Sequence, residues 1–308
     1  MEKLIVSTSP HIRSGLTTQR IMLDVLIALS PAVVASLVLY GWRALIVLAV
    51  TVASAVGSEA LFQLCIKKKQ TVTDLSAVVT GVLLALSLPA SVTVWQCAVG
   101  GAFAIVIVKC FFGGLGNNFA NPAVTARVFV LLAFAEVGAS VAPNFAELES
   151  GATPLATMQN GGTLPEIWEM LLGLRGGAIG EGCAVALLLG FGYLVYRRVI
   201  RWEVPAVFVV TLFVLSWILS GEITLALYHV LSGGALLGAI FMITDYVSTP
   251  ITFVGKLVFA FGAALVTVLI RFYGAYPEGV SFAILLLNIL SPYIEKWTTK
   301  KPFGGAEK

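Results

Sequence analysis

Ten apolar stretches, separated by short polar segments except for one long loop, constrain the fold of this chain more than any other feature of its sequence. Most come near the roughly 20 residues that an α-helix needs to cross a bilayer. They cover residues 21–40, 44–66, 75–90, 94–112, 122–136, 178–196, 204–219, 224–244, 254–271 and 279–295. Only 11% of the residues are charged, against roughly 25% in soluble domains. We therefore predict an all-α polytopic membrane protein with about ten transmembrane helices.

The basic residues indicate how such helices are oriented. With the N-terminus in the cytoplasm, sixteen of the nineteen lysines and arginines fall on the cytoplasmic side, and only Arg43, Arg175 and Arg271 fall outside. Cytoplasmic loops of membrane proteins are enriched in these residues, so we predict that both termini are cytoplasmic. The chain then divides into a cytoplasmic N-terminal segment (1–20), a first helical unit (21–136), an outer loop (137–177), a second helical unit (178–297) and a cytoplasmic tail (298–308).

A weak internal repeat relates the two helical units. Residues 80–86 resemble residues 233–239 at a spacing of 153, and residues 109–113 resemble residues 271–275 at a spacing of 162. Two units of five spans would have opposite orientations in the membrane, because five is odd. Inverted repeats build sites near the bilayer centre from interrupted helices. Chance similarity between helices rich in glycine, alanine and leucine is the alternative explanation.

Two predicted spans end in segments that do not suit a continuous helix. Residues 87–91 and 244–250 both contain proline, which cannot donate to a helix ladder. Asp245 supplies a carboxylate at the second segment. The hydroxyls of Ser248 and Thr249, with freed backbone carbonyls, provide oxygen ligands suited to a hard cation. The segment is thus either part of an ion route or an ordinary cytoplasmic turn in which Asp245 caps the next helix.

Other charged residues interrupt the apolar stretches, where charge is costly and points to function. Arg127, Glu136 and Glu181 lie near predicted span ends, from which their side chains can extend to the membrane surface. Asp24, one turn inside the first span, can do the same. Glu59 is the best candidate for a buried carboxylate, and we assign it with Asp245 to the ion route.

The sequence contains no pattern typical of a metal or nucleotide site. Its four cysteines lie on different stretches without a Cys-x-x-Cys pair, so their spacing predicts neither a zinc nor an iron–sulfur site. No Gly-x-Gly-x-x-Gly turn indicates a site for NAD, and His229 is expected to be a packing residue. We expect no bound metal, no catalytic residue within this chain and no nucleic-acid partner.

The outer loop contains the strongest candidate for a binding site. It includes Ser150, Gly151, Ala152, Thr153, Pro154 and Leu155 in succession. The two small residues before Thr153 allow close approach to the backbone, and Pro154 biases Thr153 away from helical conformation. Ser-Gly-Ala-Thr resembles the sequence on which a flavin transferase esterifies FMN to a threonine hydroxyl. Ser150 and Thr157 are rival hydroxyls.

Segments along essentially the whole chain resemble one family. They are residues 9–14, 18–31, 113–123, 150–155 and 242–250. They are similar to the family of the RnfD component of Rnf electron-transport complexes. The NqrB component of the sodium-translocating NADH:quinone reductase is a related but less similar protein. One position departs from the family's transferase motif, because Glu147 stands where that motif usually begins with aspartate.

The resemblance implies two inverted five-helix units, with an architecture like that of urea and ammonium transporters. It implies FMN linked to Thr153 through a phosphodiester, and a second, non-covalent riboflavin. It also implies a complex in a prokaryotic cytoplasmic membrane that relays electrons between reduced ferredoxin and NAD, coupled to sodium or proton transport. The expected partners are the other Rnf components (the flavoprotein RnfG, the membrane proteins RnfA and RnfE, and the iron–sulfur proteins RnfB and RnfC), a flavin transferase and membrane lipid. A small-solute channel and a purely structural membrane protein are the competing functional classes.

Overall fold

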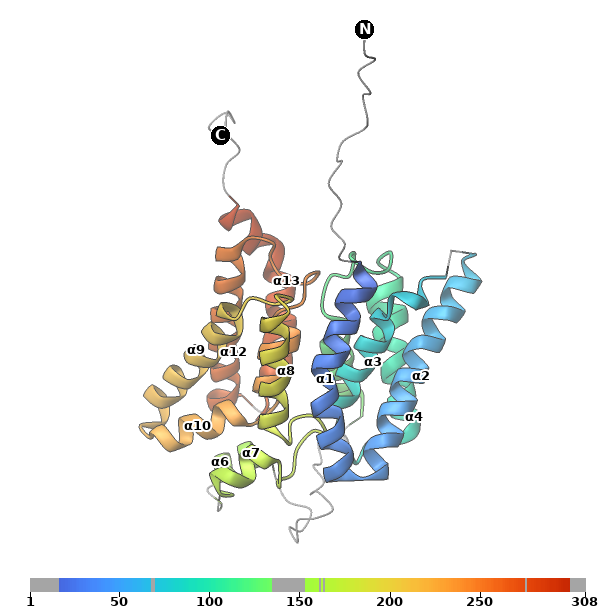
Figure 1. The fold of residues 1–308 in the computed structure, drawn as a ribbon. Coiled ribbons are helices and arrows are strands. Elements are labelled where there is room, and N and C mark those ends of the chain that lie inside the picture. Colours follow the sequence, from blue (N-terminus) through green and yellow to red (C-terminus); the bar gives the residue numbers. More distant parts are fainter. Residues whose placement is uncertain are drawn as a thin grey trace, which may run out of the picture.

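The computed structural model describes residues 17–67, 70–134, 153–160, 162, 164–274 and 276–299. The secondary structure within these ranges is helical (Figure 1). In chain order the elements are α1 (Thr18–Tyr40), α2 (Trp42–Cys65), the 3₁₀ turn η1 (Val72–Asp74), α3 (Ser76–Ser87), α4 (Val94–Phe103), the π-helix η2 (Ala104–Cys110), α5 (Pro122–Ala133), α6 (Pro154–Asn160), α7 (Ile167–Leu172), α8 (Ala184–Tyr196), α9 (Glu203–Ser220), α10 (Ile223–Leu231), α11 (Ala235–Leu237), the π-helix η4 (Gly238–Met242), α12 (Phe253–Tyr273) and α13 (Val280–Thr298).

Each of the ten predicted apolar stretches coincides with a helix or with a pair of consecutive helices. Among the described residues, α1, α2, α9 and α12 are long and apolar enough to cross a membrane. The bent pair of α10 with α11–η4 is a fifth span if it is counted as one. The chain is therefore a polytopic membrane protein. One boundary is corrected: residues 178–183 form a bridge and turns, and α8 begins only at Ala184.

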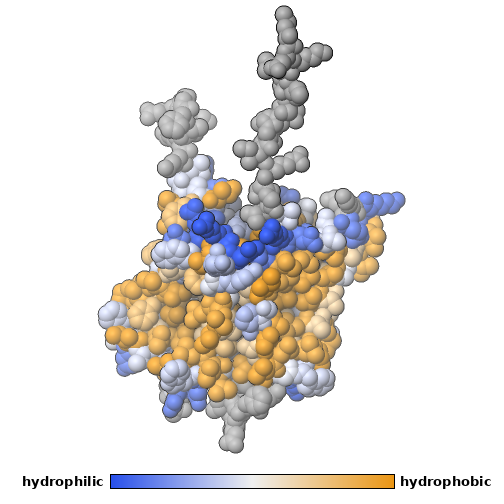
Figure 2. Space-filling view, viewed as in Figure 1, coloured by the Kyte–Doolittle hydropathy of each residue, from blue (hydrophilic) through white to orange (hydrophobic). Residues whose placement is uncertain are grey.

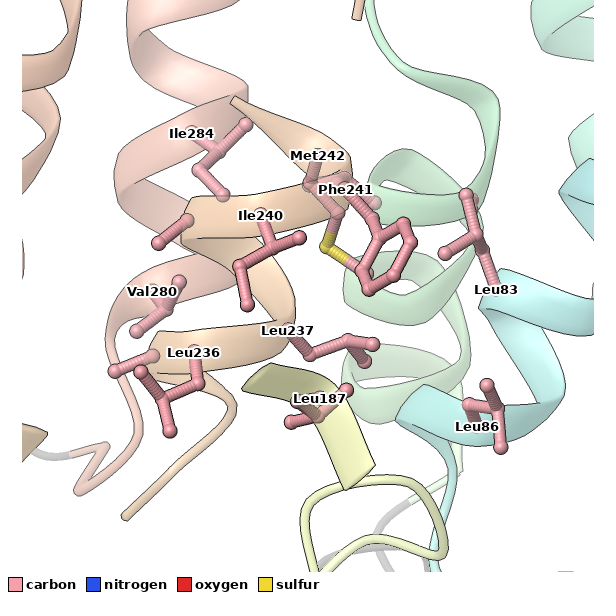
Figure 3. Close-up of a cluster of buried hydrophobic side chains, with 14 of the residues drawn as sticks. Leu83, Leu86, Leu187, Leu236, Leu237, Ile240, Phe241, Met242, Val280 and Ile284 are labelled. Carbon is pink, nitrogen blue, oxygen red and sulfur yellow. The ribbon is translucent and has the colours of Figure 1, made fainter. Parts of the chain in front are cut away.

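The helices pack in two groups with similar internal contacts (Figure 1). In the first group α2 lies against α3 and α4, and in the second α9 lies against α10 and α12. The two groups meet where α1 packs against α8 and where α5 packs against α13. Figure 3 shows part of the shared core, to which α3 contributes Leu83 and Leu86, α8 contributes Leu187 and α13 contributes Ile284.

Small residues bring several of these helices close together. A Cβ atom at Gly81 of α3 would lie 2.8 Å from Val52 Cα of α2, and one at Gly190 of α8 would collide with Ala28 O of α1. Within a bilayer, where lipid is as apolar as leucine, helix association depends on such close van der Waals packing. These glycines therefore set the spacing of the helix pairs that hold the bundle together.

The bundle has two distinct ends. Helix α1 begins and α13 ends at one end, and α6 and α7 lie at the other (Figure 1). We call these ends the terminal side and the α6 side. Hydrophobic residues cover the face between them, and hydrophilic residues gather along its edge at the terminal side (Figure 2). This belt agrees with a protein whose middle is surrounded by lipid.

One predicted span is broken at a point that the sequence did not reveal. Helices α10 and α11–η4 are bent by 63°, and the bend lies at Ser232, Gly233 and Gly234. The two glycines have φ values of +63° and +67°, which side chains disfavour. The predicted interruption further along, at residues 244–250, is a turn between η4 and α12.

Candidate functional site

Thr153 lies at the α6 side, directly before α6. The residue is half-buried, and its Oγ1 accepts a hydrogen bond from Ala156 N at 3.3 Å. The rival hydroxyl of Thr157 donates to Thr153 O at 2.8 Å, so that hydroxyl is engaged within α6. The predicted site residues Ser150, Gly151 and Ala152 lie outside the described residues.

Helix α6 is docked onto the break between α10 and α11. Pro154 and Leu155 are buried, and Leu155 packs so closely on Gly233 that a Cβ there would collide with its side chain. At the other end of α6, Gln159 Nε2 donates to Arg271 O at 3.0 Å. The broken helix therefore positions the segment that carries Thr153.

A small cavity of about 10 Å³ adjoins Thr153. It is lined by Thr153, Pro154, Leu155, Arg175, Gly176, Gly177, Glu181, Ser232, Gly233 and Glu278. We call it the Thr153 cavity. Its lining combines the α6 segment, the connection before α8, the helix break and Glu278, two residues before α13. Elements distant in sequence therefore converge on one hydroxyl.

Three arginines with their side chains inside the protein surround this region. Arg127, Arg175 and Arg271 are 8%, 4% and 2% exposed. Arg175 Nη1 donates to Ser232 Oγ at 3.0 Å, and its Nη2 donates to Leu231 O. Arg271 donates to His229 O, to Ser232 O at 2.9 Å and to Gly233 O at 3.4 Å. Because a helix end leaves carbonyls without partners, these two arginines stabilise the break.

Arg127 joins the two helix groups. It donates from α5 to Ser87 O at the end of α3 and to Glu278 Oε2 before α13, and it pairs with Glu181 Oε1 at 3.5 Å. The prediction that Arg127 and Glu181 extend to the membrane surface is thus wrong, because both are buried against partners. The guanidinium also faces the α6 side, so fifteen and not sixteen basic residues remain on the side predicted to be cytoplasmic.

Among the described residues, the charges around the Thr153 cavity do not balance. The three arginines face two carboxylates, Glu181 and Glu278. Burial and the proximity of Glu278 raise the pKa of Glu181 to about 7, although the arginines oppose this shift. Arg175 Nε is buried without an acceptor among the described residues. Around neutral pH the cluster therefore has a surplus of positive charge and an unused donor, a combination suited to an anion.

A second cavity, of about 110 Å³, lies between the two helix groups near the terminal side. Its polar lining residues include Ser76, Thr80, Lys109, Asn118, Asn121, Thr244 and Asp245. We call it the terminal-side cavity. Asp245 and Lys109 thus face one space, although they come from different helix groups.

Asp245 is held within a turn of its own. Its Oδ2 accepts from Ser248 Oγ at 2.7 Å and from Asn121 Nδ2 at 3.5 Å, and its backbone O accepts from Thr249 Oγ1. Burial raises the pKa of its carboxyl, and hydrogen bonds from Ser248 and nearby backbone oppose the shift. The cap of α12 is Thr252, not Asp245. The turn therefore brings Asp245, Ser248 and Thr249 together, as predicted, but the helix-cap alternative is wrong.

Glu59 is buried, at 1% exposure, which confirms that part of the prediction. Its Oε1 accepts from Lys109 Nζ at 2.8 Å. Lys109 also donates to Ser76 Oγ and lines the terminal-side cavity. Glu59 is therefore linked to the cavity of Asp245 through Lys109 and does not line it itself.

Asp24 and His229 are also explained by their contacts. Asp24 is buried and accepts from Tyr193 Oη at 3.0 Å, and it pairs with Arg197 at 3.3 Å. The prediction that Asp24 extends to the membrane surface is therefore wrong. His229 stacks on the ring of Phe272 with centroids 4.9 Å apart, in agreement with a packing role.

Sequence reasoning did not select Arg175, Arg271 or Glu278 as site residues. Arg271 falls at the edge of a predicted apolar span, and Glu278 lies just before another. Charge at such positions is the only signal that could have identified them. Charge in the sequence does not show that these residues converge with Arg127 near Thr153, because they contact residues that are distant in the sequence.

These features define a class of protein, a polytopic helical membrane protein with buried polar sites between two groups of helices. The sequence matches the profile of the NQR2, RnfD, RnfE family over residues 5–304, and the chain belongs to this family.

Three curated relatives match the chain along nearly its whole length, and each is the D component of its complex. The chain is 44% identical to that of the Na(+)-translocating ferredoxin:NAD(+) oxidoreductase complex of Acetobacterium woodii, covering 98% of this chain and 95% of that protein. It is 35% identical to the D component of the proton-translocating ferredoxin:NAD(+) oxidoreductase complex of Clostridium ljungdahlii, covering 97% of this chain and 96% of that protein. It is 37% identical to the D component of the ion-translocating oxidoreductase complex of Halorhodospira halophila, covering 96% of this chain and 94% of that protein.

Proposed function

We propose that this chain is the RnfD component of an ion-translocating ferredoxin:NAD oxidoreductase complex and carries FMN through a phosphodiester to Thr153. The observation that carries the proposal is the half-buried Thr153 hydroxyl beside a cluster of three buried arginines. The relatives named above, which match the chain nearly end to end, support the assignment to this complex.

The residues around Thr153 suit the phosphodiester. Such a group carries one negative charge, which would compensate the surplus positive charge of the cluster. Arg175, with its unused Nε, and Ser232 in the same cavity wall would hold it. Burial of these donors strengthens their interaction with an anion because water is excluded. The flavin would supply one-electron redox chemistry, and the protein would supply position and electrostatic environment.

The chain would act as a relay and not as a complete enzyme. Its sequence lacks the glycine-rich turn of an NAD site and the cysteine spacing of an iron–sulfur cluster. Electrons would therefore pass between this chain and its partners, which we infer to be the flavoprotein RnfG, the membrane proteins RnfA and RnfE and the iron–sulfur proteins RnfB and RnfC. We also infer a non-covalent riboflavin as a second cofactor.

We infer that the fold consists of two inverted five-helix repeats, α1–α5 and α8–α13. Ser248 follows Ser87 by 161 residues, and Asn288 follows Arg127 by the same number. Arg127 donates to Ser87 O, and the Asn288 amide, oriented to satisfy both neighbours, donates to Ser248 O at 3.0 Å. A side chain thus donates to the carbonyl of an equivalent serine once on each side of the protein, as an inverted repeat requires. This supports ten spans with an architecture like that of urea and ammonium transporters.

The orientation can be tested by labelling. Because fifteen of the nineteen basic residues are predicted from the sequence to fall on one side, we expect the terminal side to be cytoplasmic and Thr153 to face outward. Cysteines placed singly at exposed Asn160 and Lys67, in a cysteine-free background, should react with an impermeant thiol reagent on intact cells only at Asn160. Labelling confined to position 67 would reverse the orientation.

We infer that Asp245, with Ser248 and Thr249, forms part of the ion route, and that Glu59 contributes through Lys109. Asp245→Asn keeps the size and most hydrogen bonds of this turn but removes a charge that faces the terminal-side cavity. The complex should then require several-fold more sodium for turnover, or pump fewer ions per electron, while flavin content stays normal. Wild-type sodium dependence together with wild-type pumping would assign Asp245 to the turn alone.

Fluorescence of the denatured wild-type chain tests the function itself, because only covalent flavin survives denaturation. The expected result is a fluorescent band whose tryptic peptide containing Thr153 carries the mass of FMN less one water. A colourless chain that conducts a small solute in liposomes would instead support a channel, which the terminal-side cavity makes the second candidate. A flavin-bearing chain that co-purifies with an NADH:quinone reductase would indicate the NqrB component of that enzyme.

A further inference from the structure

A third cavity, of about 220 Å³, opens at the terminal side between the turn that joins α8 to α9 and the start of α12. It is lined by Arg198, Val199, Ile200, Arg201, Val204, Thr244, Tyr246 and Lys256. Three of these eight residues are cations, and none is acidic. We call this space the basic cavity.

Within the described part of the chain, the three cations have no carboxylate partner. No ion pair joins Arg198, Arg201 or Lys256 to an acidic residue anywhere in the described ranges. The neighbouring Arg197 differs, because it pairs with the buried Asp24. The protein thus uses one arginine of this turn internally and leaves the other cations facing the cavity.

Local structure holds these cations in position. Arg198 has a φ of +55° just after α8, a backbone conformation that residues other than glycine rarely adopt. The guanidinium of Arg201 lies 4.8 Å from the centre of the Phe253 ring, which leaves its N–H edges free for an acceptor. Lys256 lies 5.9 Å from the centre of the Tyr246 ring.

The surroundings of the basic cavity are apolar and exposed. Trp202, Ile251 and Val254 are 58%, 77% and 57% exposed next to these cations. A soluble anion would gain nothing from such neighbours, whereas the acyl chains of a lipid would cover them. Tryptophan and tyrosine are also enriched at the membrane surface, and basic pockets between helices on the cytoplasmic side suit phospholipid head groups.

We propose that the basic cavity binds the phosphate of an anionic phospholipid, with its acyl chains lying along Trp202, Ile251 and Val254. Arg198, Arg201 and Lys256 donate to the phosphate oxygens. Val199, Ile200, Thr244 and Tyr246 line this cavity and the terminal-side cavity alike. The bound lipid therefore adjoins the space that Asp245 faces.

Titration of the full chain with its co-purifying partners in detergent tests the proposal. The probes are dioctanoyl phosphatidylglycerol, dioctanoyl phosphatidylcholine and inorganic phosphate. We expect tighter binding of phosphatidylglycerol than of either other probe. Each of Arg198→Gln, Arg201→Gln and Lys256→Gln should weaken that binding about fivefold, and the triple variant more than tenfold. The control Lys296→Gln removes an exposed cation from the last turn of α13, on the same side, and should leave the affinity unchanged.

Several outcomes would overturn the proposal. Equal affinity of wild type and the triple variant for phosphatidylglycerol would show that these cations do not form the site. Equal binding of phosphatidylcholine would exclude recognition of charge. Phosphate that binds as tightly as phosphatidylglycerol would assign the cavity to a soluble anion. Native mass spectrometry should independently show fewer retained anionic lipids on the triple variant than on Lys296→Gln.

Discussion

Thr153→Ala should abolish the covalent flavin completely, while the protein still inserts into the membrane. The substitution removes the hydroxyl that we propose carries the phosphodiester. It also removes the hydrogen bond from Ala156 N that Thr153 accepts at the start of α6, which costs about 1 kcal/mol of local stability. The four long apolar helices do not depend on it. The denatured chain should therefore be present at the wild-type level but without flavin fluorescence.

Two further variants make this test specific. Thr153→Ser keeps a hydroxyl and should retain part of the flavin. Thr157→Ala removes the rival hydroxyl within the described residues, which is engaged with Thr153 O, and should retain all of the flavin. The host must contain a flavin transferase that acts on the outer face. If Thr153→Ala keeps its fluorescence and Thr157→Ala loses it, the attachment site lies at Thr157.

Replacing Arg127 should cause a large loss of stability. Its side chain links Ser87 O at the end of α3 with Glu278 before α13, so Arg127→Met leaves two carboxylates near each other without this cation. Breaking a buried pair costs about 3–5 kcal/mol. Because the Glu278 side chain is 26% exposed, we expect the lower end, about 3 kcal/mol.

Reversible unfolding in mixed micelles measures this effect. Arg43→Met removes an exposed arginine and should change the free energy of unfolding by no more than about 0.5 kcal/mol. Adding Glu278→Gln to Arg127→Met should recover part of the loss, since one unpaired charge is removed. A free energy of unfolding for Arg127→Met within about 0.5 kcal/mol of wild type would show that this ion pair does not hold the helix groups together.

The raised pKa of Glu181 affects how the stability of the Arg127 variants is measured. Since burial raises it to about 7, the carboxyl is protonated in part around neutral pH and holds less negative charge against the arginines. Its preference for the protonated form stabilises the folded state at low pH, and this contribution is lost as pH rises towards 7. Stability comparisons of the Arg127 variants should therefore be made at one fixed pH.

Local sequence determined the helices of this protein and the identity of the candidate hydroxyl. The ten apolar stretches correspond to α1–α5 and α8–α13 because helix formation in an apolar surrounding depends on composition over about 20 consecutive residues. Thr153 could be selected because the residues next to it differ from those of an ordinary loop. Glu59 could be recognised as buried because it lies about two turns inside the end of its stretch.

Only the tertiary structure decided which charges meet. Arg127 and Asp24 were expected to extend to the membrane surface, since hydropathy treats each residue as if it faced lipid alone. Their partners, Glu278 and Arg197, follow them by 151 and 173 residues, and no local spacing predicts contacts at that distance. The break at Gly233 has the same origin, because its freed carbonyls are tolerated only where Arg271 and Arg175 reach them from other elements.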